Sequence, residues 1–189
     1  MRRTRLSNDD ALLLAQGIGE NSGLTQLDLS HNHILEAGLL ALLKVAAQHP
    51  RLRHLYFARV GLTRDVAPSV ARLLSSSSTL LTLDLSWGLL GERGALKVAK
   101  GLIGGLCCLT SLNLRNNDIG QEGASAIAQA LRGNSSLRFN SSLPYASSAN
   151  NIGPLSFMAF VQRHLDLSFN GIGDAGAIQV ARVRALLVF

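Results

Sequence analysis

A glycine-rich segment near the end of the chain has the spacing of a dinucleotide-binding loop. The residues from Gly171 to Gly176 read GIGDAG, which matches the pattern G-x-G-x-x-G. Between a strand and a helix, such a loop holds a pyrophosphate against backbone N–H groups. A related segment, Asp118 to Gly123, reads DIGQEG and lacks the first glycine. Because glycine also serves wherever a chain turns a tight corner, we interpret these glycines as turn residues and predict no cofactor.

Histidines and aspartates that could carry acid–base or metal chemistry recur along the chain. They are His31, His54, His164, Asp28, Asp84 and Asp166. Imidazole and carboxylate groups form general acid–base pairs or zinc sites when they converge on one point. Here the spacing places them on successive strands about 4.8 Å apart, with several strands between His31 and His164. No nucleophile recurs beside them, so we predict a solvated surface with no catalytic residues, no metal site and no enzymatic activity.

The cysteines and the charge narrow the class of protein further. Cys107 and Cys108, the only cysteines, are expected to be small hydrophobic residues at a helix–strand junction. Neighbouring cysteines rarely bridge each other, which predicts a reducing, cytoplasmic compartment. The net charge is +6, but the arginines are scattered and not gathered as in nucleic-acid readers, so nucleic acid is not an expected partner. No apolar run reaches the roughly 18 residues that a membrane span needs, and no membrane association is predicted.

A nine-residue phrase repeats along the chain and identifies the elements that position these side chains. It reads LTQLDLSHN from Leu24 to Asn32 and LTSLNLRNN from Leu109 to Asn117. Weaker copies are LRHLYFARV from Leu52, LLTLDLSWG from Leu80 and QRHLDLSFN from Gln162. The interval between the first four copies is nearly constant, and a repeat of about 28 residues is typical of a solenoid. In a solenoid each unit buries its apolar face against its neighbours.

Each unit is predicted to be a strand, a turn and a helix. Leu27 and Leu29 alternate with Asp28 and Ser30, as in a strand with one buried face. Apolar residues within 122–132 recur at helical spacing. Because helices are wider than strands, stacking them on one side bends the array. The nine-residue phrase has the leucine-rich repeat form L-x-x-L-x-L-x-x-N. We therefore predict an α/β right-handed leucine-rich repeat solenoid of five to six units, with a parallel sheet on the concave face and helices on the convex face.

The last position of the phrase is predicted to hold a ladder of structural asparagines. A buried amide side chain can satisfy backbone groups that would otherwise cost about 1–3 kcal/mol each. The ladder positions are Asn32, Asn117, Asn150 and Asn170. Val60 and Gly88 replace asparagine in two units, and we expect the ladder to be weaker there.

The chain is predicted to form a single domain over residues 1–189 that is incomplete at both ends. Leu6 to Leu24 aligns without gaps on Ile119 to Leu137, so the first segment corresponds to the helical half of a unit. Residues 137–161 form an irregular unit, because the segment from Leu137 to Asn150 is longer than the corresponding segment from Leu24 to Asn32. This unit is either a binding loop or a damaged repeat.

Units of this length that include a full helix resemble the ribonuclease-inhibitor-like class of leucine-rich repeats. That class includes ribonuclease inhibitor, the sensing arm of NOD-like receptors and Ran GTPase-activating protein. The resemblance implies a protein–protein interaction module that binds another protein on its concave face. The alternatives are a regulator of a small GTPase, which would resemble Ran GTPase-activating protein, and a fragment of a NOD-like receptor.

The outward positions of the predicted sheet form the candidate partner-binding surface. They are Gln26, Asp28, His31, His54, Tyr56, Arg59, Thr82, Asp84, Trp87, Asn113, Arg115, Asn116, His164, Asp166 and Phe169. Trp, Tyr and Arg are the residues that anchor protein interfaces, so Tyr56, Arg59 and Trp87 are expected to form its centre. Trp87 has an alternative interpretation, in which it folds over Gly88 and fills the space of the absent asparagine.

Overall fold

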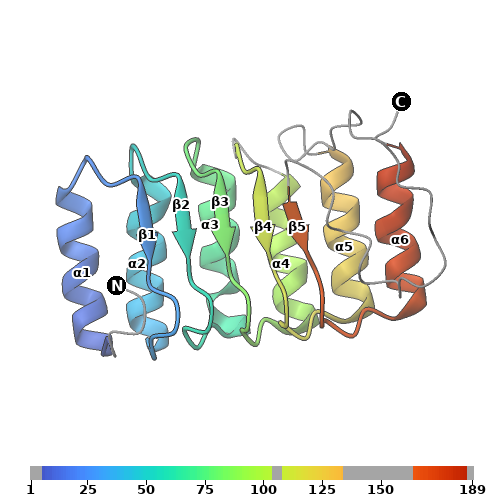
Figure 1. The fold of residues 1–189 in the computed structure, drawn as a ribbon, viewed down its shortest axis with the longest axis horizontal. Coiled ribbons are helices and arrows are strands. Elements are labelled where there is room, and N and C mark those ends of the chain that lie inside the picture. Colours follow the sequence, from blue (N-terminus) through green and yellow to red (C-terminus); the bar gives the residue numbers. More distant parts are fainter. Residues whose placement is uncertain (1–5, 104–107, 134–163, 187–189) are drawn as a thin grey trace, which may run out of the picture.

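The computed structural model describes residues 6–103, 108–133 and 164–186, in which helices and strands alternate along the chain (Figure 1). The helices are α1 (Asn8–Glu20), α2 (Glu36–Gln48), α3 (Ala67–Ser76), α4 (Gly91–Ile103), α5 (Gly120–Gly133) and α6 (Gly173–Leu186), with a 3-10 turn at Arg64–Val66 before α3. The strands are β1 (Gln26–Asp28), β2 (His54–Tyr56), β3 (Thr82–Asp84), β4 (Ser111–Asn113) and β5 (His164–Asp166). No helix in this part of the chain is long and apolar enough to cross a membrane.

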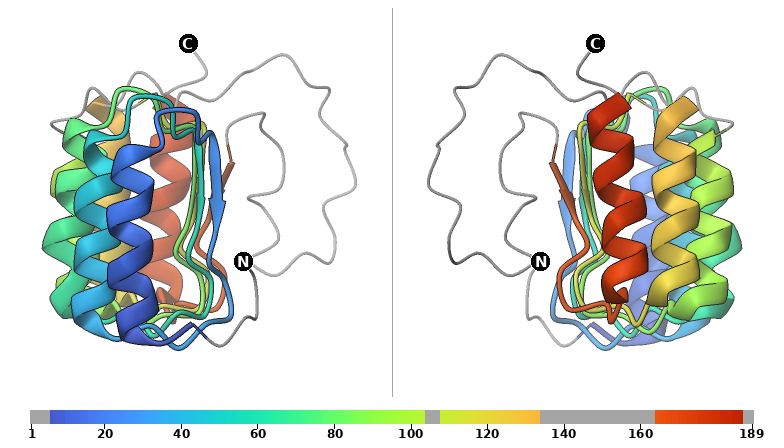
Figure 2. Two further views of the ribbon diagram at one scale, coloured as in Figure 1. Left: turned by 90° about the vertical axis from the view of Figure 1, so that its left-hand side faces the viewer. Right: turned by 90° about the vertical axis from the view of Figure 1, so that its right-hand side faces the viewer.

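The strands form one open parallel sheet in chain order, β1 to β5. The helices lie together on one face of this sheet, and Figure 2 shows that none of those described covers the other face. This arrangement confirms the predicted α/β right-handed leucine-rich repeat solenoid. Strand β4 pairs directly with β5, and Ser111 lies in register with His164. The irregular unit predicted at 137–161 lies outside the described residues.

Leucines that point away from the open face of the sheet build the core. Leu55, Leu83 and Leu112 are in register on adjacent strands and are fully buried. Leu29 and Leu85, each just after a strand, are buried in the same way. Because strand residues alternate between the two faces, burying these positions turns the residues between them toward the open face.

The helices bury small and apolar residues against the sheet. Ala124, Ile127, Ala128 and Leu131 in α5 are all at most 3% exposed, which confirms the helical spacing predicted for this segment. Helices α3 and α4 approach each other closely at Gly101, where an added Cβ would lie 2.5 Å from the main-chain oxygen of Ala71. The distance between neighbouring units therefore depends on how closely their helices pack, as well as on the spacing of their strands.

Helix α1 takes the place of the helical half of a unit. Its Ser7 and Asp10 form a capping box, and the two hydrogen bonds from Ser7 lower the pKa of the Asp10 carboxyl below its ordinary value of 3.8. The Leu6 N–H donates to Asn32 Oδ1 at 3.2 Å, just as the Ile119 N–H donates to Asn170 Oδ1 at 3.3 Å. The alignment of the first segment on a later repeat therefore holds at the level of single hydrogen bonds.

Candidate functional site

The strand register sorts the predicted partner-binding residues into three rows that cross the open face of the sheet. The strand-start row is Gln26, His54, Thr82, Ser111 and His164. The strand-end row is Asp28, Tyr56, Asp84, Asn113 and Asp166. The turn row, three residues after each strand end, is His31, Arg59, Trp87, Asn116 and Phe169. Of the predicted residues, only Arg115 lies between rows, and none of the predicted set is buried.

The strand-start row contains one residue that sequence reasoning missed. Ser111 is half-buried between Thr82 and His164 in the register, and the repeat alignment alone would have pointed to it. The Nδ1 atom of His54 is 3.1 Å from Thr82 Oγ1, so the hydrogen-bonding capacity of this histidine is partly used within the sheet.

The strand-end row contains three aspartates, and each accepts a hydrogen bond from the main chain of its own turn. The Oδ1 atoms of Asp28, Asp84 and Asp166 accept the N–H two residues further on at 2.9, 2.8 and 2.8 Å. Asn113 makes the same bond to the Arg115 N–H at 3.0 Å, and its Nδ2 donates to the second oxygen of Asp84 at 3.0 Å. These side chains shape the turn after each strand. The three aspartates of the row lie on β1, β3 and β5, so none is next to another aspartate in the row.

The turn row is held in an unusual backbone conformation. Its five residues have φ angles of +61°, +55°, +61°, +53° and +57° in row order, a region that disfavours residues other than glycine by about 1–2 kcal/mol. Main-chain hydrogen bonds between units fix this conformation, such as Arg59 N–H to Ser86 O at 3.0 Å and Trp87 N–H to Arg115 O at 2.8 Å. The side chains of the row are therefore presented in set directions before any partner binds.

Two arginines stack on aromatic rings along the turn row. The guanidinium carbon of Arg59 lies 3.9 Å from the centre of the Trp87 ring, and that of Arg115 lies 4.3 Å from the centre of the Phe169 ring. Trp87 is 42% exposed and Phe169 is 60% exposed. Cation–π contacts of this kind contribute about 0.5–1 kcal/mol at exposed sites. Together the two pairs make a cationic and aromatic patch across four consecutive units.

Arg115 reaches this patch from a position that is buried in two other units. Ser30 and Ser86, which occupy the same repeat position, are 3% and 4% exposed. The long side chain of Arg115 instead extends to the ring of Phe169 in the next unit.

A second residue that sequence reasoning missed lies two positions after Trp87. Leu89 is 72% exposed, whereas the same repeat position holds His33, Gly61, Asp118 or Gly171 elsewhere. The alignment therefore contained a signal, a single large apolar side chain in an otherwise polar or glycine column. Large exposed apolar side chains beside a preformed aromatic patch are typical of interaction surfaces.

The predicted asparagine ladder can be followed at three of its four positions. Asn32, Asn117 and Asn170 are at most 3% exposed. Asn170 Nδ2 donates to the main-chain oxygens of Leu114, Leu167 and Ser168 at 2.8, 2.9 and 3.2 Å. Its Oδ1 accepts the N–H groups of Asn117 and Ile119 at 2.7 and 3.3 Å. Asn150 lies outside the described residues, and next to Asn117 the ladder continues with Asn170.

The two units that lack a ladder asparagine are completed differently. Val60 is fully buried and makes an apolar rung. At Gly88, an added Cβ would lie 2.6 Å from Asn117 Oδ1, so the next unit's asparagine already fills that space. The alternative prediction that Trp87 fills the space is wrong, because its ring is exposed beneath Arg59. Asn117 Oδ1 is itself buried without a hydrogen-bond partner, which weakens the ladder here as expected.

The glycine-rich segment has a structural explanation in each of its three glycines. Gly171 and Gly173 both have φ of +58°, which side chains disfavour. At Gly176, an added Cβ would lie 3.3 Å from the Cβ of Ile172, a tight contact, and 3.4 Å from the Cα of Gln121 in the neighbouring helix. Among the residues with assigned structure, no group of three or more His, Cys, Asp or Glu side chains is arranged to hold a metal ion.

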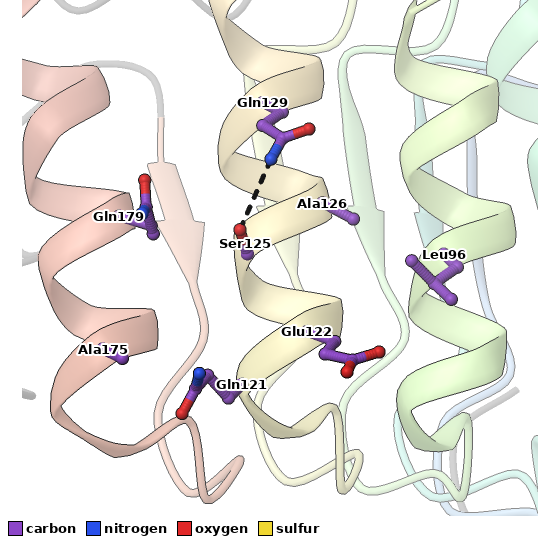
Figure 3. Close-up of a pocket in the computed structure, with 8 residues that line it drawn as sticks. All are labelled: Leu96, Gln121, Glu122, Ser125, Ala126, Gln129, Ala175 and Gln179. Carbon is purple, nitrogen blue, oxygen red and sulfur yellow. Dashed lines mark hydrogen bonds between the residues drawn. The ribbon is translucent and has the colours of Figure 1, made fainter.

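The helical face carries a shallow groove of about 310 Å³ between α4, α5 and α6. Figure 3 shows that Gln121, Gln129 and Gln179 line it. The Nε2 atom of Gln129 donates to Ser125 Oγ at 3.5 Å. The rest of its lining is the Glu122 carboxylate, the Ser125 hydroxyl, and the apolar side chains of Leu96, Ala126 and Ala175. This lining offers polar contacts and no aromatic anchor, in contrast to the turn row.

Comparison with known proteins places the chain among repeat proteins. The family model for the Leucine Rich repeat matches residues 20–43, 105–128 and 163–181. Human NACHT, LRR and PYD domains-containing protein 12 is 30% identical over 178 residues, which cover 93% of this chain and 14% of that protein. Rat NACHT, LRR and PYD domains-containing protein 3 is 38% identical over 101 residues, 52% of this chain and 10% of that protein. The chain thus spans about a tenth to a seventh of these relatives.

A shorter relative supports the same assignment, and two solved structures share the fold. Porcine ribonuclease inhibitor is 28% identical over 202 residues, which cover 88% of this chain and 44% of that protein. The tropomodulin C-terminal domain of Caenorhabditis elegans superposes with a TM-score of 0.64 at 12% identity, covering 94% of this chain and 90% of that one. Leiomodin-1 actin-binding site 2 gives a TM-score of 0.67 at 18% identity, with coverages of 94% and 87%. These two structures show the fold alone.

The repeat matches, the relatives and the open parallel sheet agree with one another. The chain is a ribonuclease-inhibitor-like leucine-rich repeat protein with relatives among the NOD-like receptors.

Proposed function

We propose that this repeat domain is a protein–protein interaction module that binds its partner on the concave face formed by the sheet, without catalysis. The observation that carries the proposal is the turn row, where Trp87 and Phe169 stay exposed beneath stacked arginines. Tryptophan and arginine dominate the energetics of protein interfaces. Because the turn row is already held in place, less conformational entropy is lost when a partner binds.

The sheet-face residues other than the turn row supply the surround of this proposed surface. The aspartates of the strand-end row are already hydrogen-bonded within the chain, so they contribute shape and polarity around the aromatic anchors. Polar groups that are already paired cost less to cover than unpaired ones. A cytoplasmic location, supported by the cysteine usage, belongs to the same proposal.

A second candidate role is that of the repeat arm of a NOD-like receptor. The 30% identity to human NACHT, LRR and PYD domains-containing protein 12 over most of this chain favours it. Mass spectrometry of the endogenous protein tests this role. Peptides from a nucleotide-binding module in the same polypeptide would support it, and an endogenous protein of only these 189 residues would contradict it. The alternative role as a small-GTPase regulator stays a prediction.

The proposed binding face is tested with two matched double variants once a partner has been captured and purified. Tyr56→Ala/Trp87→Ala truncates the sheet face, and Arg72→Ala/Lys100→Ala truncates exposed residues of α3 and α4. Because truncating a central anchor costs about 2 kcal/mol or more, the sheet-face pair should raise Kd by about 30-fold or more. The helix-face pair should leave Kd nearly unchanged. Loss of binding only in the helix-face pair would place the interface on the convex side and overturn the proposal.

A further inference from the structure

We infer that the turn row, together with the adjacent Arg115, recognises an acidic segment of the partner, in which two separate carboxylates are bound by Arg59 and Arg115. This inference rests on the proposed function and specifies the chemistry of its partner. It concerns which groups the two stacked arginines present to solvent, and how far apart they stand.

Both guanidinium groups can donate hydrogen bonds to a carboxylate of the partner. The ion pair found in the described part of the chain joins Arg64 to Asp65 at 3.9 Å, and neither Arg59 nor Arg115 takes part in one there. Stacking on Trp87 and Phe169 uses one face of each guanidinium, and Arg59 is exposed while Arg115 is half-buried. A guanidinium edge matches a carboxylate with two parallel hydrogen bonds. Because stacking already restrains the long side chains, less entropy is lost when an acid binds.

The spacing of the two arginines indicates two separate acids and not one shared anion. Arg59 follows β2 and Arg115 follows β4, with the unit of β3 between them. Two strand spacings correspond to about 10 Å. A single phosphate is too small to bridge that distance. A segment in the polyproline II conformation advances about 3.1 Å per residue and completes a turn every three residues, so acidic residues at positions i and i+3 would lie on one face and meet both arginines.

The unit between the arginines defines what the middle of the segment should be. Trp87 belongs to this unit, and its main-chain N–H donates to the main-chain oxygen of Arg115 at 2.8 Å. The residue is 42% exposed. Leu89 lies two residues further on and is 72% exposed. An apolar residue between the two acids would therefore cover apolar surface. The nearby Asp84 has both carboxylate oxygens bonded, to the Ser86 N–H and to Asn113 Nδ2, and the net charge of +6 favours an acidic partner.

Synthetic peptides test this chemistry without a known partner. The probe is a fluorescein-labelled ten-residue peptide with a Glu-Leu-Ala-Glu centre, and its controls have a Gln-Leu-Ala-Gln centre or a single phosphoserine. Fluorescence anisotropy with the 189-residue chain gives Kd. Emission from Trp87, the only tryptophan, reports whether the peptide lies on the turn row. Arg59→Gln/Arg115→Gln is compared with Arg72→Gln/Lys100→Gln, which removes two positive charges from the helical face.

The diacid peptide should bind about tenfold or more tightly than the diamide peptide, as expected for two charge-assisted contacts. Arg59→Gln/Arg115→Gln should remove that preference, and Arg72→Gln/Lys100→Gln should keep it. Equal binding of the diamide, tighter binding of the phosphoserine peptide, or insensitivity to Arg59→Gln/Arg115→Gln would each overturn the inference. Failure of every peptide would overturn it as well. The proposed function would still stand if Tyr56→Ala/Trp87→Ala abolished capture of the partner, so the two failures can be told apart.

Discussion

Individual asparagines connect neighbouring units of this solenoid. Asn170 donates to three main-chain oxygens and accepts from two N–H groups. Asn117 also donates to three main-chain oxygens, but its Oδ1 has no partner. The Leu114 oxygen accepts from both asparagines, so it keeps one donor when either is removed. These differences predict unequal effects of the same substitution.

We expect Asn170→Ala to destabilise the fold more than Asn117→Ala. The first change strands two N–H groups and the Leu167 oxygen, whereas the second mainly strands the Leu85 oxygen. With about 1–3 kcal/mol for each buried unpaired group, Asn170→Ala should cost about 3 kcal/mol or more and Asn117→Ala about 1–2 kcal/mol. Urea denaturation gives both free energies of unfolding.

Asn116→Gly is the matched control for this comparison. Asn116 is only half-buried and has φ of +53°, a conformation that glycine adopts without strain. Its substitution should therefore change stability by about 0.5 kcal/mol or less. If all three variants unfolded at the same urea concentration, the ladder would not be the source of stability between units.

At the scale of elements, the helices set how closely the units can stack. Gly101 in α4 lies against the backbone of α3, where a Cβ would be 2.5 Å from Ala71 O and 2.6 Å from Ala71 Cα. Backbone atoms cannot rotate away as the end of a side chain can, so a larger residue would have to push the two helices apart. Gly17 in α1 has nothing within 4 Å of its added Cβ and is exposed.

Gly101→Ala and Gly17→Ala should therefore change stability in opposite directions. The first should destabilise by about 1–3 kcal/mol through overpacking. The second should stabilise by about 0.5–1 kcal/mol, because alanine favours the helix. Thermal unfolding followed by circular dichroism measures both changes. A stabilising Gly101→Ala would show that α3 and α4 are further apart than described.

At the scale of the whole molecule, the fold was largely predictable because every unit repeats one local pattern. The alternation of Leu27 and Leu29 with Asp28 placed both faces of the strand, and the same phrase carried that result along the chain. The contacts that define the candidate surface join units that are distant in sequence. The stacking of Arg115 on Phe169 crosses from β4 to β5, and periodicity says nothing about which side chains meet there.

The filling of the Gly88 position was unpredictable for the same reason. Sequence reasoning treated the missing asparagine as a hole and offered Trp87 to fill it. The space is taken by Asn117 Oδ1 from the next unit, a contact that depends on the distance between units. As a result Trp87 is left on the open face, where Arg59 stacks on its ring. The position that lacks a ladder asparagine, Gly88, therefore lies next to Trp87, an exposed aromatic residue of the proposed interface.

Shielding of Trp87 by a bound partner is the most direct test of the proposed interface. Replacing Trp87, the only tryptophan, with 5-hydroxytryptophan lets its emission be excited separately from that of the partner. Acrylamide quenching of this emission is then compared in the free chain and in the purified complex. Because Trp87 is 42% exposed and central to the turn row, we predict that the partner strongly reduces quenching. Unchanged quenching in a saturated complex would show that the partner binds elsewhere and would contradict the account.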